Sequence, residues 1–351
     1  MLVRLLDIIY NKVTNMDIDF IVPWLDCNDP KWQKDYATYS PHTKSGKENV
    51  RFRDHDIFRY WFRAVEKYAP WVHKVYLITN GKFPDWINPN ASKLVLVRHA
   101  DYIPEEYLPT FNSGVIEIFL HRIKGLSEHF VYFNDDFFLN APVKPEYYFK
   151  NGLPCDNNKE TYFNVPIYTP KDGFGICISM LKSIGLINSH FNRWKTVQQS
   201  PMRWFGPHLG VKGFIMSCLL AKQRLFIGFT NYHIEQAFLK SIFEKLWIEE
   251  KEFLSKSCTR FRTYDSIYQY LYRYWQFASN SFYPMKRSRA FFFLNNREVI
   301  RELENTMMNN TYSSICINDS AFCSDEDYEY FKATLPVLFK KKFSNKSSFE
   351  L

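Results

Sequence analysis

The sequence predicts an α/β fold built around a largely parallel, buried sheet. Short apolar runs alternate with segments of helical apolar spacing through the N-terminal half, and polar turn residues follow the apolar runs. This alternation is typical of a sheet whose crossover helices cover its faces. Hydrophobic residues make up 46% of the 351-residue chain, enough for a sizeable core. The length suggests about two structural units.

The first elements follow from local patterns. The apolar run 18–24 predicts a buried strand that ends in the acidic turn 26–30. Asp54 is expected to cap a helix, and Pro70 follows its end. That helix would bury one face made of Ile57, Trp61, Ala64, Val65 and Tyr68.

The next elements repeat the alternation. Residues 74–78 and 93–97 predict strands, the first closed by Asn80-Gly81. Ser113 is expected to cap a second amphipathic helix. The uninterrupted apolar run 130–133 then predicts another buried strand.

The second half of the chain is less regular. Residues 141–230 carry no clear repeat and are expected to hold substrate-specific loops. Helical spacing returns over 234–248 and 266–277, residues 315–317 predict a strand, and Ser324 is expected to cap the last helix. The predicted organisation is an N-terminal segment (1–16), an α/β core (17–150), a variable acceptor region (151–230) and a helical lobe that completes the site (231–351).

Charge and composition exclude several classes of protein. The chain carries a net charge of +8, which we expect to be spread along it. A basic run at 340–342, beside Phe339 and Phe343, suggests either a contact with an anionic membrane or a solvated turn, and the turn is the simpler interpretation. No RNP, KH or zinc-finger pattern supports a nucleic-acid partner. The longest apolar stretches, 213–221 and 289–294, are far shorter than the ~20 residues of a membrane-spanning helix.

Cysteine and glycine usage narrow the choice further. Seven cysteines without a C-x-x-C pair indicate neither a zinc knuckle nor a disulfide framework, so a reducing cytoplasm is expected. The N-terminus lacks the small-residue cleavage site of a signal peptide. Glycine is scarce, and no glycine-rich phosphate-binding motif occurs.

Acidic residues at predicted strand ends suggest a site. Asp26 and Asp29 follow the first strand, and Asn134, Asp135 and Asp136 follow the run 130–133. Ligands in such sheets bind beyond the carboxyl ends of the strands. Carboxylates placed there commonly hold a divalent cation against phosphate oxygens, although Asn and Asp also end strands as simple turns. Spacing alone leaves both interpretations open.

Basic residues offer further candidates. Arg51, Arg53, Arg59 and Arg63 could clamp phosphate, or they could form an ordinary basic helix face. His121 and Arg122 lie near a helix end, and His233 precedes another helix; a lone histidine is more often structural than catalytic. Arg260 and Arg262 precede a predicted helix N-terminus, where an anion could bind.

Four ordered blocks of sequence resemble the Stealth family of sugar-1-phosphate transferases, which includes bacterial capsular polysaccharide phosphotransferases and the animal enzyme that makes the mannose-6-phosphate tag. Cys27 stands where the family usually has glycine, and Gln236, Ala237 and Tyr264-Asp265 also depart from its commonest forms. The blocks are IDFIVPWLDCNDPKW (18–32), the series from RFRDHDIFRYWFRAVEKYAPWV (51–72) through LITNG (77–81) and LPTFNS (108–113) to HRIKGLSEHFVYFNDD (121–136), the pair 231–247 and 260–276, and SICINDSAF (314–322) with SSFE (347–350).

The resemblance implies a Rossmann-like nucleotide-sugar transferase core with a mostly parallel sheet and a helical second lobe. It implies transfer of hexose-1-phosphate or N-acetylhexosamine-1-phosphate from a UDP-sugar, such as UDP-N-acetylglucosamine, to a glycan hydroxyl, with release of UMP. Asp135 and Asp136 would hold Mg²⁺ or Mn²⁺. His233 would be the general base, with Asp136 as the alternative, and Arg262 would stabilise charge.

The resemblance also implies a wider substrate-binding set. Asp319 would orient metal or substrate, and Arg51 or Arg53 would add positive charge. The residues expected to contact substrate are Asp26, Asp29, Arg51, Arg53, Asp54, Arg59, Arg63, Asn80, Thr110, His121 and Arg122.

Two other functions remain open. A metal-dependent glycosyltransferase would release UDP, but its usual D-x-D cue is replaced here by N-D-D. A non-catalytic glycan-binding protein could keep the same fold. The expected setting is the cytoplasm, with a lipid-linked oligosaccharide or other glycan as acceptor and a peripheral contact with the inner face of the plasma membrane as an option.

Overall fold

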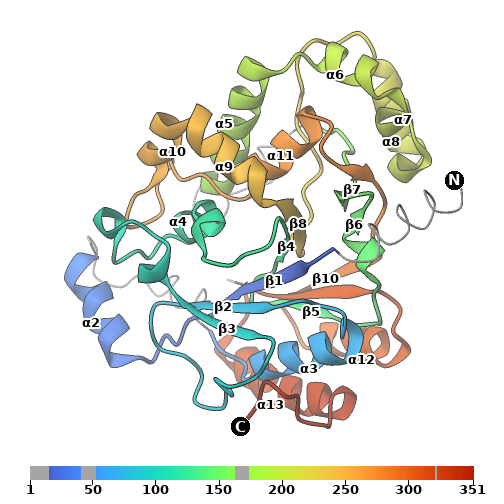
Figure 1. Cartoon of the computed structure of the whole chain (residues 1–351). Coiled ribbons are helices and arrows are strands. Elements are labelled where there is room, and N and C mark those ends of the chain that lie inside the picture. Colours follow the sequence, from blue (N-terminus) through green and yellow to red (C-terminus); the bar gives the residue numbers. More distant parts are fainter. Residues whose placement is uncertain (1–15, 41–52, 163–173, 321) are drawn as a thin grey trace, which may run out of the picture.

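A computed structural model describes residues 16–40, 53–162, 174–320 and 322–351 of the chain. Within these residues the centre of the fold is a five-stranded sheet in the order β3-β2-β1-β4-β8 (Figure 1). β1 to β4 are parallel and β8 is antiparallel to β4, so the expected α/β fold is confirmed. The strands are β1 (Ile18–Pro23), β2 (Val75–Thr79), β3 (Leu94–Arg98), β4 (His129–Tyr132) and β8 (Gln236–Leu239).

Helices cover both faces of this sheet, and the core lies between the layers. α3 (Phe58–Tyr68) connects β1 to β2 and buries its aromatic side; the edge of the Trp61 ring meets Phe133 with the ring centroids 5.3 Å apart. In Figure 1, α3 lies below the sheet with α12 (Val299–Asn309) and α13 (Asp325–Lys342), and α9 to α11 lie above it. The upper helices are α4 (Ser113–Ile118), α9 (Lys240–Glu249), α10 (Lys251–Ser257) and α11 (Tyr270–Ala278).

A second sheet of the described chain, in the order β10-β11-β5, continues from the end of β4. β5 (Phe137–Leu139) starts shortly after β4, and β11 (Ser314–Asp319) pairs with it in the antiparallel sense. β10 (Arg289–Leu294) is parallel to β11 and forms the edge. This sheet therefore brings residues near 316 beside residues near 136.

The remaining helices form an upper lobe at the top of Figure 1. It is attached through a buried ion pair, because Glu160 binds Arg193 of α6 at 2.7 Å. A second buried pair, between Asp156 and Arg273 of α11 at 2.7 Å, lies outside the lobe. The lobe contains α5 (Phe174–His190), α6 (Arg193–Gln199), α7 (Pro201–Trp204) and α8 (Gly210–Leu219). Outside it lie α2 (Pro30–Tyr39) and the small strands β6 (Phe149–Lys150), β7 (Leu153–Asp156) and β9 (Tyr283–Pro284).

Local details correct some expectations about helix starts. Asp54 does not cap α3; its carboxylate accepts a hydrogen bond from Asp56 N within a turn where Asp56 has a φ of 54°, and the helix begins only at Phe58. Asn112 rather than Ser113 caps α4, through the backbone N–H of Gly114. The cap at Ser324 is confirmed, because its hydroxyl accepts from Asp327 N.

Residues 236–239 are a strand and not part of the helix expected over 234–248. They form β8 because the free edge of β4 accepts a partner there, with Gln236 opposite Tyr132. This pairing satisfies backbone groups that would otherwise be buried unpaired. Tertiary pairing thus overrides the helical spacing of this segment.

The basic run 340–342 forms the last turn of α13. Lys342 donates to Asn140 and Asn310, and burial lowers its pKa to about 8. Lys341 pairs with Glu304 at 3.0 Å, and Phe339 and Phe343 lie in the core. The run is therefore the last turn of a helix and not a loop turn, with Lys340 and Lys341 exposed to solvent, and a contact with an anionic membrane stays a prediction.

Arg63 fastens the C-terminus. Its Nε and Nη2 atoms each donate to the Glu350 carboxylate at 2.7 Å, and Nη1 donates to Phe343 O. The neighbouring Phe349 is buried against Phe62, with ring centroids 5.3 Å apart. Because this guanidinium group already binds a carboxylate, Arg63 does not clamp phosphate as expected.

No helix in the part of the chain that the structure describes is long and apolar enough to cross a membrane.

Glu350→Ala should lower the free energy of unfolding by about 3 kcal/mol, because it leaves the mostly buried Arg63 guanidinium unpaired. Urea unfolding followed by circular dichroism measures the change. Asp85→Ala, which removes the exposed partner of Lys82, is the control and should change little. Equal effects of the two substitutions would contradict the anchoring role.

Candidate active site

Asp136 is held at the point where the two sheets meet. It lies in the short connection between β4 and β5, and its backbone carbonyl accepts from Ile317 N of β11 at 2.9 Å. The register sets Cys316 opposite Phe137, so β11 side chains reach the carboxylate. Its Oδ2 atom accepts from Asn318 Nδ2 at 3.0 Å and from the Cys316 thiol at 3.3 Å.

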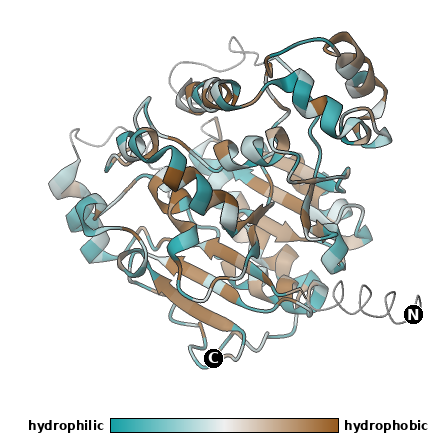
Figure 2. Cartoon of the chain, turned by 45° about the horizontal axis from the view of Figure 1, so that its top comes forward, coloured by the Kyte–Doolittle hydropathy of each residue, from teal (hydrophilic) through white to brown (hydrophobic). Residues whose placement is uncertain are grey.

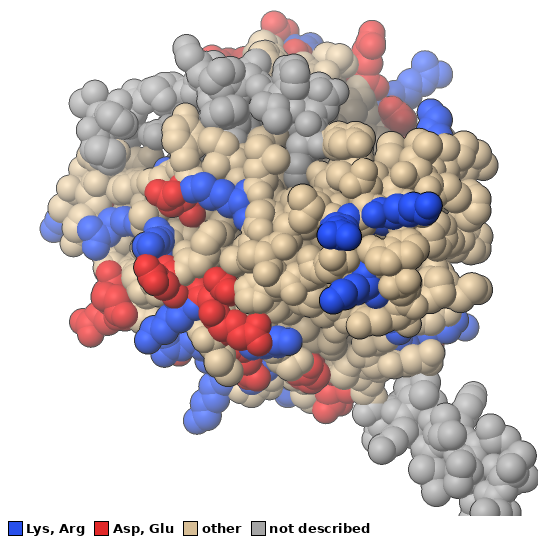
Figure 3. Space-filling view, turned by 90° about the horizontal axis from the view of Figure 1, so that it is seen from above, with Lys and Arg blue, Asp and Glu red and all other residues tan. Residues whose placement is uncertain are grey.

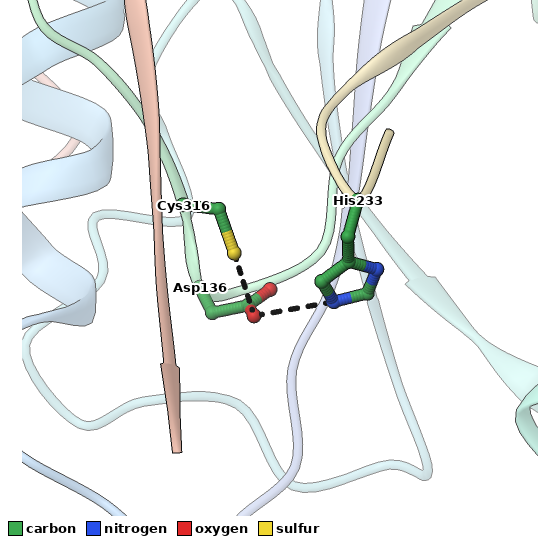
Figure 4. Close-up of side chains that lie close together, drawn as sticks. All are labelled: Asp136, His233 and Cys316. Atoms are coloured by element: carbon green, nitrogen blue, oxygen red, sulfur yellow. Dashed lines mark hydrogen bonds and ion pairs between the residues drawn. The ribbon is translucent and has the colours of Figure 1, made fainter. Parts of the chain in front are cut away.

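His233 approaches the same carboxylate from the other side (Figure 4). Because β8 runs antiparallel to β4, the residues just before β8 lie at the carboxyl end of β4. The Nε2 atom of His233 lies 3.5 Å from Asp136 Oδ2. The Phe137 and His233 rings are nearly perpendicular, with their centroids 4.8 Å apart. Nδ1 lies on the side of the ring away from Asp136 (Figure 4). The geometry therefore joins a carboxylate to an imidazole.

The carboxylate of Asp136 is the group at this point that could hold a divalent cation. Ligand atoms of Asp136, His233 and Cys316 lie within 4.8 Å of one another. Burial and the nearby Asp136 charge raise the pKa of Cys316 well above its usual range, so the thiol stays protonated and acts as a hydrogen-bond donor. Asp136 Oδ1 is buried and has no hydrogen-bond partner among the described residues. That oxygen can accept a hard divalent cation.

Asp135 adds a second carboxylate beside Asp136. Its side chain keeps contact with solvent, but the protein atoms crowded around it raise its pKa to about 7, and the Asp136 charge adds to the shift. Asp54 and Asp319 raise it further. Negative charge is therefore concentrated here, and a bound cation would relieve the repulsion.

Asp319 is held by a histidine that the sequence analysis did not single out. His55 Nε2 lies 2.8 Å from Asp319 Oδ1, and the His55 side chain is buried. The His55 ring packs against Tyr328, and the guanidinium of Arg53 lies 4.4 Å from the centre of that tyrosine ring. The R-x-H spacing in RFRDH offered the one signal for His55, but a lone histidine beside an arginine has no specific meaning.

Arg262 lies near a buried glutamate that the sequence analysis also missed. Its Nη2 atom donates to Ser113 Oγ at 2.8 Å. Glu117 of α4 is buried and accepts from Gln269 N at 2.8 Å. Burial raises the pKa of Glu117 to about 7, and the hydrogen bond from Gln269 N, the charge of Arg262 and the neighbouring His233 oppose the shift. Arg262 and His233 therefore both lie near one carboxylate.

Other predicted residues surround the site or support its loops. Asp26 accepts from Asn28 N. Partial burial raises the pKa of the half-buried Cys27 thiol, and the charges of Asp26 and Asp54 add smaller increases. Asp29 caps α2 by accepting from Lys31 N and Trp32 N. Asn80 follows β2, and its buried side-chain oxygen has no hydrogen-bond partner in the described chain.

Several predicted substrate contacts also have partners within the protein. Arg59 lies over Trp86, with 5.5 Å from its guanidinium to the ring centre, and pairs with Asp56. Thr110 is buried and accepts from Asn112 N. His121 packs against Phe243 and Trp247, and burial lowers its pKa to about 4. Arg122 lies over Phe119, and Arg51 lies outside the described residues.

Comparisons with known proteins agree on one family. The family model described as Stealth protein CR2, conserved region 2, matches residues 51–156, which include Asp135 and Asp136. The exopolysaccharide phosphotransferase cps2G of Lactiplantibacillus plantarum is 38% identical over 95% of this chain and 96% of its own length. The capsular polysaccharide phosphotransferase WcwK of Streptococcus pneumoniae is 38% identical over 96% of this chain and 99% of its own length.

A further relative and a solved structure complete the comparison. The receptor polysaccharide phosphotransferase WefC of Streptococcus oralis is 35% identical over 95% of this chain and 99% of its own length. The structure of the galactosyltransferase LgtC with donor and acceptor sugar analogs covers 90% of this chain and 95% of its own, with 9% identity and a TM-score of 0.36.

Glu117→Gln should stabilise the protein at neutral and alkaline pH. The folded-state pKa of Glu117 is about 7 against an ordinary value of 4.5, so the folded state binds the extra proton and loses stability as pH rises from 4.5 to 7. Glutamine cannot ionise and keeps the acceptor oxygen for Gln269 N. We expect the variant to gain up to about 3 kcal/mol at pH 8 and almost nothing at pH 4.5.

Urea unfolding at a series of pH values measures this difference. Glu105→Gln removes an exposed carboxylate and serves as the control, with a small and nearly constant effect. A Glu117→Gln difference that is independent of pH would contradict the raised pKa.

Proposed function

The chain belongs to the Stealth family of polysaccharide phosphotransferases, and we propose that it transfers hexose-1-phosphate or N-acetylhexosamine-1-phosphate from a UDP-sugar to a glycan hydroxyl. The product is a phosphodiester in a capsular or other cell-surface polysaccharide. The observation that carries this proposal is the pairing of His233 with Asp136, beside Asp135, at the carboxyl end of β4. It supplies a proton acceptor next to carboxylates suited to a diphosphate-bound cation.

The reaction forms one phosphorus–oxygen bond and breaks another. The acceptor hydroxyl oxygen attacks the phosphorus that bears the sugar, and the bond from that phosphorus to the oxygen bridging the two phosphates breaks. UMP leaves with the bridging oxygen, and the hydroxyl proton passes to the enzyme. The chain must therefore align the nucleophile, remove its proton and counter the charge on the leaving group.

His233 is the proposed general base. With the proton on Nε2 facing Asp136, the Nδ1 lone pair is available to accept the hydroxyl proton. The 3.5 Å separation from Asp136 Oδ2 is compatible with a pair that shortens when substrate binds. When His233 is the base, Asp136 orients the imidazole and stabilises its charged form. Asp136 is the alternative base.

Asp135 and Asp136 are the residues that would hold Mg²⁺ or Mn²⁺. When bound, the ion would neutralise the diphosphate. Arg262 would add positive charge near His233, and Asp319, fixed by His55, would orient substrate from the opposite side. Asp26, Asp29, Asp54, Asn80 and Arg53 form the surrounding set that we propose for donor contacts.

An exposed aromatic surface beside His233 is the proposed acceptor subsite. β10 alternates, with Phe292 and Leu294 buried and Phe291 and Phe293 half exposed on the opposite side. Phe291 pairs across the sheet with Cys316, and Phe293 pairs with Asn318, the two residues that hold Asp136. Side chains of paired residues share one face. This face is therefore continuous with the Asp136 carboxylate.

The aromatic rings are suited to a sugar. Phe291 and Phe293 lie nearly parallel with their centres 6.2 Å apart, and Phe291 also lies 6.2 Å from the His233 ring. Apolar C–H faces of a pyranose pack on such rings while its hydroxyls stay hydrated. A sugar on this platform would present a hydroxyl toward His233.

The competing reaction is that of a metal-dependent glycosyltransferase, which would attack the anomeric carbon and release UDP. The names of the relatives favour phosphotransfer. A carboxylate–imidazole pair next to a second acid is suited to proton transfer, and a glycan-binding protein without activity does not require one. We further propose a lipid-linked oligosaccharide as the acceptor and a cytoplasmic setting.

Asp136→Asn and His233→Ala should each slow sugar-phosphate transfer about a thousandfold or more, because one removes the metal ligand and the other the base. Purified protein is incubated with UDP-sugars, a divalent cation and glycan acceptors, and UMP, UDP and the phosphodiester are quantified. His190→Ala, which alters a histidine paired with Glu250 elsewhere, is the matched control and should keep full activity.

Circular dichroism checks that each variant is folded. A folded, fully active His233→Ala enzyme would contradict the assignment of His233 as the base. Acceptor-dependent UDP with a phosphate-free product would instead identify an ordinary glycosyltransferase.

Phe291→Ala and Phe293→Ala should each raise the acceptor KM about fivefold to tenfold and leave the donor KM unchanged, because they remove only stacking surface. Steady-state kinetics with acceptor varied at saturating donor measures the effect. Phe322→Ala, at an exposed phenylalanine outside β10, is the control. An unchanged acceptor KM in both β10 variants would exclude the platform.

A further inference from the structure

The outer part of the upper lobe exposes large apolar side chains to solvent. We call this set the outer apolar face. It spans α7, α8 and the turn after α8, and its members have exposed fractions between 45% and 82%. Figure 2 shows strongly hydrophobic turns in this outer part of the lobe. The members are Met202, Val211, Phe214, Ile215, Leu219 and Leu225.

The apolar side of α8 faces solvent, and its side of small residues packs against the protein. Val211, Ile215 and Leu219 are four residues apart, so they lie on one side of the helix, and that side faces solvent. The buried side holds the small residues Gly213 and Ser217. A side chain at Gly213 would meet Leu209 at 3.0 Å, so the helix packs closely through its small residues. An apolar stripe directed outward is typical of a surface that binds a partner.

The sequence of this region contains basic residues and no acidic ones. Residues 173–234 contain seven Lys or Arg and no Asp or Glu, so they hold most of the net charge of +8. The charge excess is therefore concentrated and not spread along the chain as expected. Lys212, Lys222 and Arg224 are exposed within or beside the outer apolar face. Figure 3 shows Lys and Arg side chains without acidic neighbours in the middle of its right half, the side where Figure 1 places α7 and α8.

We propose that the outer apolar face docks on an anionic lipid membrane. Apolar residues would enter the interface between headgroups and acyl chains while Lys212, Lys222 and Arg224 bind the negative headgroups. Apolar exposure alone would also suit a protein partner, but residues 201–225, which form this face, contain no Asp or Glu, and the exposed Lys212, Lys222 and Arg224 match a uniformly negative surface better.

The connection to the active site is short. Leu225 is followed within eight residues by His233, so the segment that leaves the outer apolar face leads directly into the site. Thr230 and Asn231 of this segment are hydrogen-bonded to Arg273, which itself binds Asp156. Docking would thus present the site to an acceptor anchored in the same membrane. This last point rests on the proposed function, whereas the docking itself does not.

Vesicle sedimentation tests the proposal with the full chain. Vesicles of phosphatidylcholine with phosphatidylglycerol should pellet the protein, and vesicles of phosphatidylcholine alone should pellet far less. High salt should weaken binding, because screening reduces the attraction of the basic residues. The triple variant V211S/I215S/L219S and the triple variant K212Q/K222Q/R224Q should each bind the anionic vesicles about tenfold more weakly or worse.

Val337→Ser, at an exposed apolar residue of α13, is the matched control and should bind like the unaltered protein. Binding that is equal in all variants, or absent for the unaltered protein, would overturn the proposal. A dimer that V211S/I215S/L219S converts to a monomer, seen by light scattering, would also overturn it by assigning the face to a second copy.

Activity separates this proposal from the proposed function. Both triple variants should keep their rate of UMP release with a soluble glycan acceptor, because they lie outside the site. An active enzyme that ignores vesicles would refute the membrane face alone, and a vesicle-binding protein that never releases UMP would refute the proposed reaction alone.

Discussion

The position of the Asp136 carboxylate is the constraint on which the candidate site depends. β4 ends just before it, β11 supplies the Cys316 and Asn318 donors, and the segment before β8 brings His233. Each of these contacts requires an antiparallel pairing, β5 with β11 or β4 with β8. A parallel arrangement of either pair would carry the same side chains to the opposite end of the sheet.

Buried charges fasten the parts around this centre. The pair Glu160–Arg193 joins the upper lobe to the core, and Arg63–Glu350 joins the C-terminus to it. The pair Asp156–Arg273 joins β7 to α11. Such pairs contribute less to net stability than their number suggests, because desolvation offsets most of the attraction. Their greater effect is on specificity: a buried charge left unpaired is costly, so alternative packings of the lobe are disfavoured.

Two surfaces of the protein expose apolar side chains to solvent. On β10 the exposed Phe291 and Phe293 continue the face that holds Asp136, and on α8 the apolar stripe faces solvent while small residues pack inward. A helix that buried its larger side would be the ordinary solution for a soluble domain. The first surface is the one proposed above to bind an acceptor sugar, and the second is the one proposed to bind a membrane.

The local sequence determined the α/β class, the strands β1 to β4 and the acidic turn at Asp135 and Asp136, because strands buried on both faces leave short uninterrupted apolar runs, helices buried on one face leave a repeating apolar pattern, and polar residues follow the strand ends. The four sequence blocks determined the family. Only the tertiary structure decided that residues 236–239 form a strand, that Arg63 binds Glu350, and that His55 and Glu117 lie at the site. Those outcomes depend on pairings between segments far apart in the chain, and no local pattern records which distant partner a residue will meet.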